Sequence, residues 1–172
     1  MTSPSSPSVV RAPHMPEGTL EVPVVIVGGG SCGLTAAIAL RDSGVDCVVL
    51  ERDARATGST ALSSGFIPAA QTRIQHALGI EDSHECLIDD VINKAHGLAP
   101  RPLVTAYVKS VTLAIDALEA KGLPFEIVDG FLYPGHRVRR MHAMPEKTGE
   151  TFMTRLEQLA TRMGADLLNQ AL

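Results

Sequence analysis

A chain of 172 residues, of which 45% are hydrophobic and 20% charged, can bury a core, so its composition predicts one folded domain and excludes a disordered protein. The formal net charge of −4 leaves no basic surface for nucleic acid, and no apolar run approaches the roughly 20 residues that a membrane-spanning helix needs. Because the N-terminus also lacks a secretory signal, we expect a cytoplasmic protein that has no membrane span and binds no nucleic acid.

The N-terminal residues differ in composition from the rest of the chain. Four prolines lie among serines before residue 21, and such a segment cannot bury enough apolar surface to order itself. We therefore predict a flexible tail over residues 1–21 and a folded domain over residues 22–172.

Three glycines follow the first strand pattern. Gly28, Gly30 and Gly33 have G-x-G-x-x-G spacing between an apolar strand pattern at 22–27 and an apolar helix pattern at 31–43. In a dinucleotide-binding fold the first glycine makes a tight turn, the second lets the backbone approach a pyrophosphate, and the third lets the helix pack closely on the strand. The local pattern therefore predicts a dinucleotide site.

A second strand pattern, at 46–50, ends in Glu51 and completes a βαβ unit of roughly 30 residues, which predicts a parallel sheet. A carboxylate about 20 residues beyond the glycines accepts hydrogen bonds from ribose hydroxyls and repels a 2′-phosphate. We therefore expect NAD or FAD as the ligand. The backbone N–H groups of Ser31 and Cys32 would face the pyrophosphate, and Arg52 is a further candidate for cofactor binding.

The cysteines argue against a metal site. Cys32, Cys47 and Cys86 have neither C-x-x-C spacing nor an even count, so the sequence predicts no zinc site and no disulfide framework, and it fits a reducing compartment. A helix N-terminus lowers the pKa of a thiol, but Cys32 is better interpreted as a small residue in the phosphate turn.

The segment 57–68 has little periodicity and is rich in small polar residues. Such a loop can approach a ligand closely and donate backbone and hydroxyl hydrogen bonds. The same residues are also typical of a plain surface connection, so composition alone leaves both interpretations open.

Helices are predicted next at 69–78, 83–96 and 101–121. The third helix has an apolar stripe that is predicted to face the core, formed by Leu103, Tyr107, Val111, Ala114 and Leu118.

The last third of the chain predicts three more elements. Asp129 and Gly130 lie between two short apolar runs within 125–133, which indicates a β-hairpin. A helix is expected at 148–163, and a parallel strand begins at 166. The predicted fold class is α/β, a Rossmann-like parallel sheet with flanking helices, a helical insertion and a small β-hairpin.

Three blocks of this sequence resemble the flavoprotein subunits of fumarate reductase and succinate dehydrogenase, with L-aspartate oxidase and related FAD-dependent dehydrogenases. They are the glycine fingerprint with Glu51, the segment 58–65, and the segment 133–143 followed by Thr148 and Gly149. Their order and spacing are similar to the N-terminal portion of that family, from about residue 22 to the end of the chain.

This resemblance implies FAD as the cofactor, with its pyrophosphate on Gly28, Gly30 and the helix start and its adenosine ribose on Glu51. Thr57 stands where the family often has a further glycine. The resemblance further implies that the ribityl and isoalloxazine portion lies along Ser59, Thr60, Ser64 and Gly65.

The family oxidises or reduces a carbon–carbon bond next to an electron-withdrawing group, with FAD carrying the hydride. A small unsaturated acid or ketone is the implied substrate, and the electron-transfer partner is not identified. In the family the substrate-binding cations and proton-transfer residues would lie beyond Leu172, so no catalytic residue is assigned. One basic cluster could imitate such a site, and it consists of His136, Arg137, Arg139, Arg140 and His142. A solvated loop is the simpler interpretation of these residues.

Two other functions stay open at this point. The chain could be a truncated, non-catalytic nucleotide-binding module, because without later strands to close the sheet FAD affinity should be weak and an apolar sheet edge exposed. It could also be an NAD-dependent dehydrogenase with the same fingerprint, although the loop after Glu51 is unlike the usual continuation in such enzymes.

Overall fold

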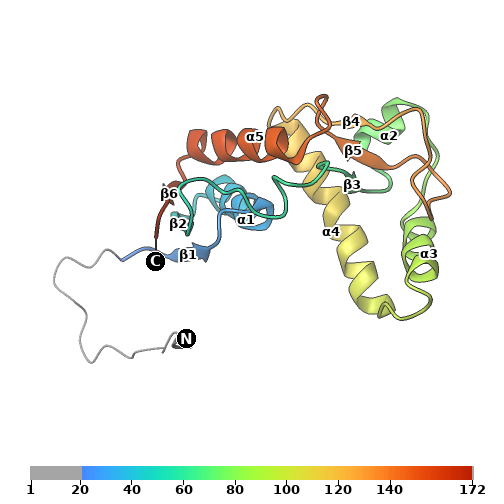
Figure 1. The fold of residues 1–172 in the computed structure, drawn as a ribbon, viewed down its shortest axis with the longest axis horizontal. Coiled ribbons are helices and arrows are strands. Elements are labelled where there is room, and N and C mark those ends of the chain that lie inside the picture. The colour runs from blue at the N-terminus through green and yellow to red at the C-terminus, as the bar shows by residue number, and fades with distance from the viewer. Residues whose placement is uncertain (1–20, 172) are drawn as a thin grey trace, which may run out of the picture.

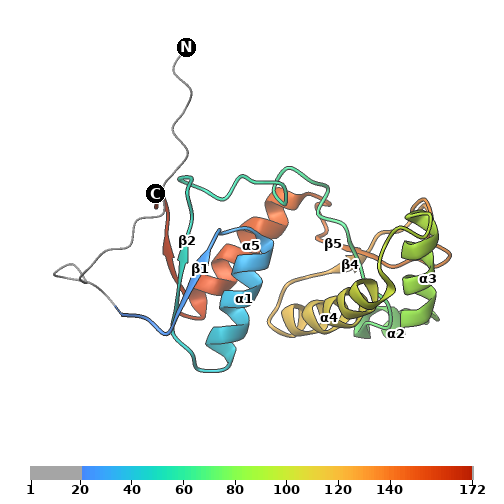
Figure 2. The ribbon, with the colours of Figure 1, turned by 90° about the horizontal axis from the view of Figure 1, so that it is seen from below.

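A three-stranded parallel sheet forms the first layer of the fold (Figures 1 and 2). The computed structural model describes residues 21–171, so the predicted tail lies almost wholly outside the described residues. The strands are β1 (Val24–Val27), β2 (Cys47–Leu50) and β6 (Asp166–Leu168), in the order β1-β2-β6. Val24 pairs with Cys47, and Val48 with Asp166, both in parallel register. The predicted parallel sheet is confirmed.

Two helices cover one face of this sheet. Helix α1 (Ser31–Asp42) joins β1 to β2, and α5 (Gly149–Arg162) leads into β6. Both lie on the same side in Figure 2, because right-handed connections that step in one direction along a sheet place their helices on one face. The buried residues between helices and sheet include Leu34 and Ile38 of α1, Val49 of β2, and Phe152 and Leu156 of α5.

The second sheet is small and antiparallel, with β5 (Met141–Ala143) between β3 (Ile67–Pro68) and β4 (Glu126–Ile127). The hairpin predicted within 125–133 is therefore wrong. Strand β4 pairs with β5, and the backbone N–H of Val128 donates to the carbonyl of Met141 at 2.8 Å. Burial decides the pairing, since Met141 and Ala143 are buried whereas Phe131 and its neighbours stay exposed.

Three helices surround the second sheet (Figure 1): α2 (Arg73–Ala77), α3 (His84–Lys94) and α4 (Arg101–Ala120). Helix α2 begins four residues later than predicted, because the N–H of Ala69 donates to the carbonyl of Arg140 at 3.1 Å and Gln71 adopts a non-helical φ of +60°. Thr72 then begins the helix with a capping box, in which its hydroxyl accepts from the N–H of Gln75 at 3.2 Å.

Helices α3 and α4 lie side by side and share a small apolar core. Leu87 and Ile88 of α3 pack there with Val104 and Val108 of α4. Within residues 21–171, no helix is both long enough and apolar enough to cross a membrane.

Candidate functional site

The glycine turn has the backbone geometry that its spacing predicts. Gly28 adopts a φ of +101°, and its N–H donates to the carbonyl of Leu50 at 2.7 Å, which ties the turn to β2. A Cβ added at Gly33 would overlap the carbonyl oxygen of Gly28 and lie 3.1 Å from Cγ2 of Ile26. Only glycine at position 33 therefore lets α1 start this close to the turn.

The N-terminus of α1 is open. Within the described residues no side chain caps it, and the N-cap residue is Gly30. A Cβ added at Gly30 would meet no described atom within 4 Å, so there is free space in front of the helix start. The first N–H groups of a helix have no partner inside the helix and favour an anion. The free amides and open approach fit the pyrophosphate of a dinucleotide.

Glu51 lies directly beside the turn. Its Oε2 accepts from the N–H of Gly29 at 2.8 Å, and its Oε1 accepts from the N–H of Asp53 at 2.9 Å. The carboxylate is thus held in place with lone pairs left for ribose hydroxyls. Arg52 directs its guanidinium to Asp53 instead and is 77% exposed, so the structure does not bring its side chain into the turn.

The loop after β2 reaches back to α1. The hydroxyls of Ser31 and Thr60 lie 3.1 Å apart, and Ser63 Oγ donates to the carbonyl of Thr60 at 2.7 Å. The N–H of Gly149, at the start of α5, donates to the carbonyl of Ser63 at 2.8 Å. A Cβ added at Gly149 would overlap the carbonyl oxygen of Thr60, so glycine there is what lets the loop pack against α5.

A cavity of about 580 Å³ lies between the start of α1, this loop and α4. Hydroxyl and thiol groups line the part next to α1, and the rest is mostly apolar apart from the hydroxyls of Tyr107 and Ser110. Of the predicted cofactor-binding residues, those that line the cavity are Ser31, Cys32, Ser59, Thr60 and Gly65. The glycine turn and Glu51 lie on the adjoining surface, so the predicted site residues extend from the end of β2 to this cavity, apart from Arg52 and the exposed Ser64.

The apolar wall of the cavity comes from a helix face that sequence patterning places in the core. The residues of α4 that are buried are Val104, Val108, Thr112, Ile115 and Leu118. The predicted core stripe is therefore largely wrong: the buried face is rotated by one residue because α3 packs on the Val104 side. Leu103 is 67% exposed, and Tyr107, Ser110, Val111 and Ala114 line the cavity.

The basic cluster has a structural role. Arg140 is buried and pairs with Asp82 at 2.8 Å and with Asp90 at 2.6 Å. Arg137 also binds Asp90, at 2.5 Å, and Arg139 binds Asp129 at 2.7 Å. Burial alone would raise the pKa of Asp90, but hydrogen bonds from Arg137 and Arg140 lower it.

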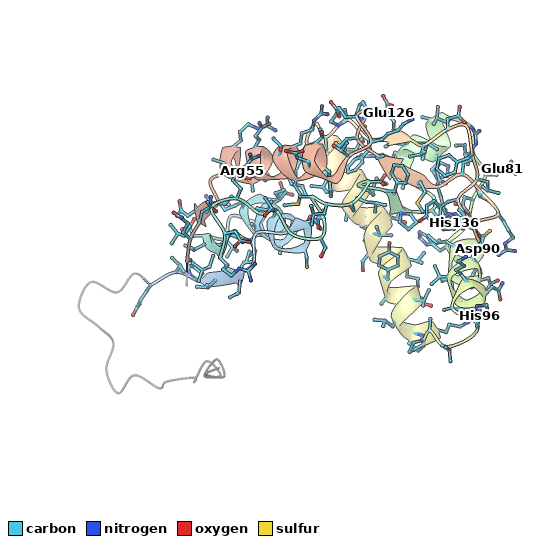
Figure 3. All side chains as sticks on the ribbon, in the orientation of Figure 1. Arg55, Glu81, Asp90, His96, Glu126 and His136 are labelled. Carbon is cyan, nitrogen blue, oxygen red and sulfur yellow. The ribbon has the colours of Figure 1, made fainter. Side chains whose placement is uncertain are left out.

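Of the two histidines of this cluster, His142 is held by hydrogen bonds within the fold. His142 is fully buried and lies 2.8 Å from the hydroxyl of Thr72, and burial lowers the pKa of its imidazole. In Figure 3, Asp90 lies on α3 and His136 beside it, at the opposite end of the molecule from Arg55 near the parallel sheet. The cluster therefore joins α3 to the second sheet, away from the glycine turn.

Residues 23–172 match the family described as FAD binding domain. The chain belongs to this family. Its cofactor is accordingly FAD, as the resemblance implied, and the uncapped start of α1 with Glu51 beside the turn fits that cofactor.

Relatives of this FAD binding domain include several reductases. The NADH:fumarate oxidoreductase of Klebsiella pneumoniae (strain 342) is 29% identical over 147 residues, which cover 84% of this chain and 16% of the relative. The urocanate reductase of Eggerthella lenta is 31% identical over 153 residues, which cover 86% of this chain and 25% of the relative.

The solved structure of the open conformation of a flavocytochrome c3 fumarate reductase matches with a TM-score of 0.76 at 26% identity, covering 87% of this chain and 26% of that one. The FAD binding domain described here thus spans 16–26% of the length of these three proteins.

Proposed function

We propose that the chain forms the dinucleotide-holding part of an FAD-dependent oxidoreductase that acts on a carbon–carbon bond next to an electron-withdrawing group. The observation that carries the proposal is the carboxylate of Glu51, which lies 2.8 Å from the N–H of Gly29 beside the uncapped start of α1. Support for the reaction class comes from relatives named fumarate, urocanate and acrylate reductases. A small unsaturated acid is accordingly the proposed substrate class.

The predicted residues other than Arg52 and Ser64 have roles in this proposal. Backbone groups at Gly28 and Gly30 and at the helix start, Ser31 and Cys32, bind the pyrophosphate, Gly33 lets α1 pack close to the turn, and Glu51 accepts hydrogen bonds from the adenosine ribose. The hydroxyls and backbone of the loop position the ribityl and ring portion, through Ser59, Thr60 and Gly65.

FAD, when bound, supplies the hydride-transfer chemistry. The described residues orient the cofactor and shield it on one side. Groups that bind the substrate and move its proton are proposed to come from outside residues 21–171, because the basic cluster is engaged in ion pairs far from the turn.

For this function we propose the cytoplasm as the location, which is supported by three unpaired cysteines.

Calorimetric titration of the purified chain with FAD and with NAD⁺ tests the proposal. We expect a yellow protein that binds one FAD and binds NAD⁺ more weakly. A preparation that takes up no added FAD would refute it. With a chemical electron donor, residues 21–171 alone should not reduce fumarate, because the groups that bind the substrate are proposed to lie outside them.

A further inference from the structure

The α4 side of the cavity differs in character from the side next to α1. Tyr107, Ser110, Val111 and Ala114 line it, so an apolar surface carries two hydroxyls. Tyr107 is 43% exposed, which leaves its ring available to a ligand. The pKa of a phenol is ordinarily about 10, and burial raises that of Tyr107 further, so its hydroxyl is protonated at neutral pH as any phenol is and can donate a hydrogen bond.

None of the described residues that line the cavity is charged. A buried cation without a carboxylate partner is costly, so this lining disfavours a positively charged ligand. The nicotinamide ring of NAD⁺ is a small cation, whereas the oxidised isoalloxazine of FAD is neutral and has three fused rings. The lining therefore suits the flavin better than the nicotinamide.

The glycine turn cannot make this distinction. FAD and NAD⁺ share the adenosine diphosphate half, which is the half that Glu51 and the start of α1 are suited to bind. Selection between the two ligands must come from the surface that meets their other half. Ser31 and Cys32 of α1 line the same cavity as Tyr107, so one extended ligand can reach from the turn to α4.

We infer that α4 is the element that selects the ring half of the dinucleotide, with Tyr107 packing against the flavin ring and Ser110 offering its hydroxyl to a polar ring edge. The inference rests on the proposed function, because it needs the pyrophosphate at α1. It adds specificity-determining residues, from a helix that the fingerprint does not include.

The test compares the affinities of the full chain for FAD, NAD⁺ and ADP by calorimetry. ADP reports the turn alone, and FAD reports the turn together with α4. Tyr107→Ala removes the ring, and Ser110→Asp places a carboxylate in the cavity wall. Each should weaken FAD binding about tenfold and leave ADP binding unchanged. Ser110→Asp should also narrow the preference for FAD over NAD⁺, because the new carboxylate compensates the cation.

Two matched variants on the same helix serve as controls. Leu113 is 71% exposed and Ala106 is exposed, and neither lines the cavity. Leu113→Ala and Ala106→Asp should therefore bind all three ligands like the unaltered chain. Circular dichroism would show that each variant keeps its helix content.

Flavin emission gives a second readout. A phenol in contact with an excited flavin quenches it by electron transfer, so FAD bound to Tyr107→Ala should be brighter than FAD bound to the unaltered chain. Tyr107→Phe keeps the packing surface but quenches less, so it should retain most of the FAD affinity and still bind a brighter FAD.

The outcomes separate the two claims. A chain that binds ADP and FAD, but whose FAD-to-ADP affinity ratio is the same in Tyr107→Ala and Ser110→Asp, would overturn the role of α4. Equal affinity of the unaltered chain for NAD⁺ and FAD would do the same. A chain that binds neither ADP nor FAD would overturn the proposed function and the role of α4 together.

Discussion

Replacement of Gly33 by alanine should destabilise the fold itself. The added Cβ would overlap the carbonyl oxygen of Gly28 and lie 3.1 Å from Ile26 Cγ2. That carbonyl belongs to a turn whose N–H is bonded to Leu50, so relief requires α1 to move away from the sheet. Overpacking of this kind costs up to about 3 kcal/mol, and the higher helix propensity of alanine returns about 1 kcal/mol, which leaves a net loss of about 2 kcal/mol.

Urea unfolding followed by circular dichroism measures this loss, and Gly30→Ala is the matched control. An added Cβ at Gly30 meets no described atom within 4 Å, so its stability should change by less than about 1 kcal/mol. The same methyl group occupies the space proposed for the pyrophosphate, so Gly30→Ala should weaken ADP and FAD binding about tenfold. A Gly33→Ala chain as stable as the unaltered one would refute the packing argument.

Three further predictions concern other parts of the structure. Glu51→Gln should weaken both ADP and FAD about tenfold in calorimetry, because a charged acceptor is lost from the ribose; unchanged ADP affinity would count against this role. Asp82→Ala removes a buried partner of Arg140 and should lower the urea-unfolding free energy by about 3–5 kcal/mol, whereas an exposed pair such as Arg101 with Asp89 should contribute less than about 1 kcal/mol. Burial lowers the folded-state pKa of His142 below its ordinary 6.5, so the stability that this neutral imidazole contributes is present above pH 6.5 and declines as the pH falls below it. In thermal unfolding, the His142→Gln variant should lose less stability than the unaltered chain as the pH falls from about 7 to 5. An identical loss of stability in both proteins would assign the pH dependence to other groups.

The βαβ unit could be predicted from the sequence because its signals are local. Strand, turn and helix follow one another directly, and the positions of Gly28 and Gly33 follow from close contacts within that short segment. The approach of Glu51 to the turn also follows, since parallel neighbouring strands end at the same edge of a sheet.

Other features depend on contacts between distant segments. Asp129 and Gly130 favour a turn, but the partner of β4 lies more than ten residues further on, where Met141 and Ala143 can be buried. The face of α4 that enters the core depends on where α3 packs, and periodicity alone cannot separate neighbouring stripes on one helix.

The role of the basic cluster also depends on contacts between distant segments, so it could not be predicted from the local sequence. Arginines in the segment 137–140 are compatible with a substrate site until Asp82 and Asp90 are seen to neutralise Arg140. Those carboxylates lie about 50 to 60 residues earlier in the chain, and no local pattern links them to the arginines.

The central claim, that the dinucleotide lies across the start of α1 and enters the adjoining cavity, is tested most directly at Cys32. Cys32 is exposed and lines the cavity, whereas Cys47 is buried and Cys86 lies beside Arg140 in the ion-pair cluster. Alkylation of each thiol by iodoacetamide can be followed by peptide mass spectrometry. The account predicts that saturating FAD or ADP slows the alkylation of Cys32 about tenfold and leaves the alkylation rate of Cys86 unchanged. Cys32 that reacts equally fast in free and FAD-saturated protein would contradict it.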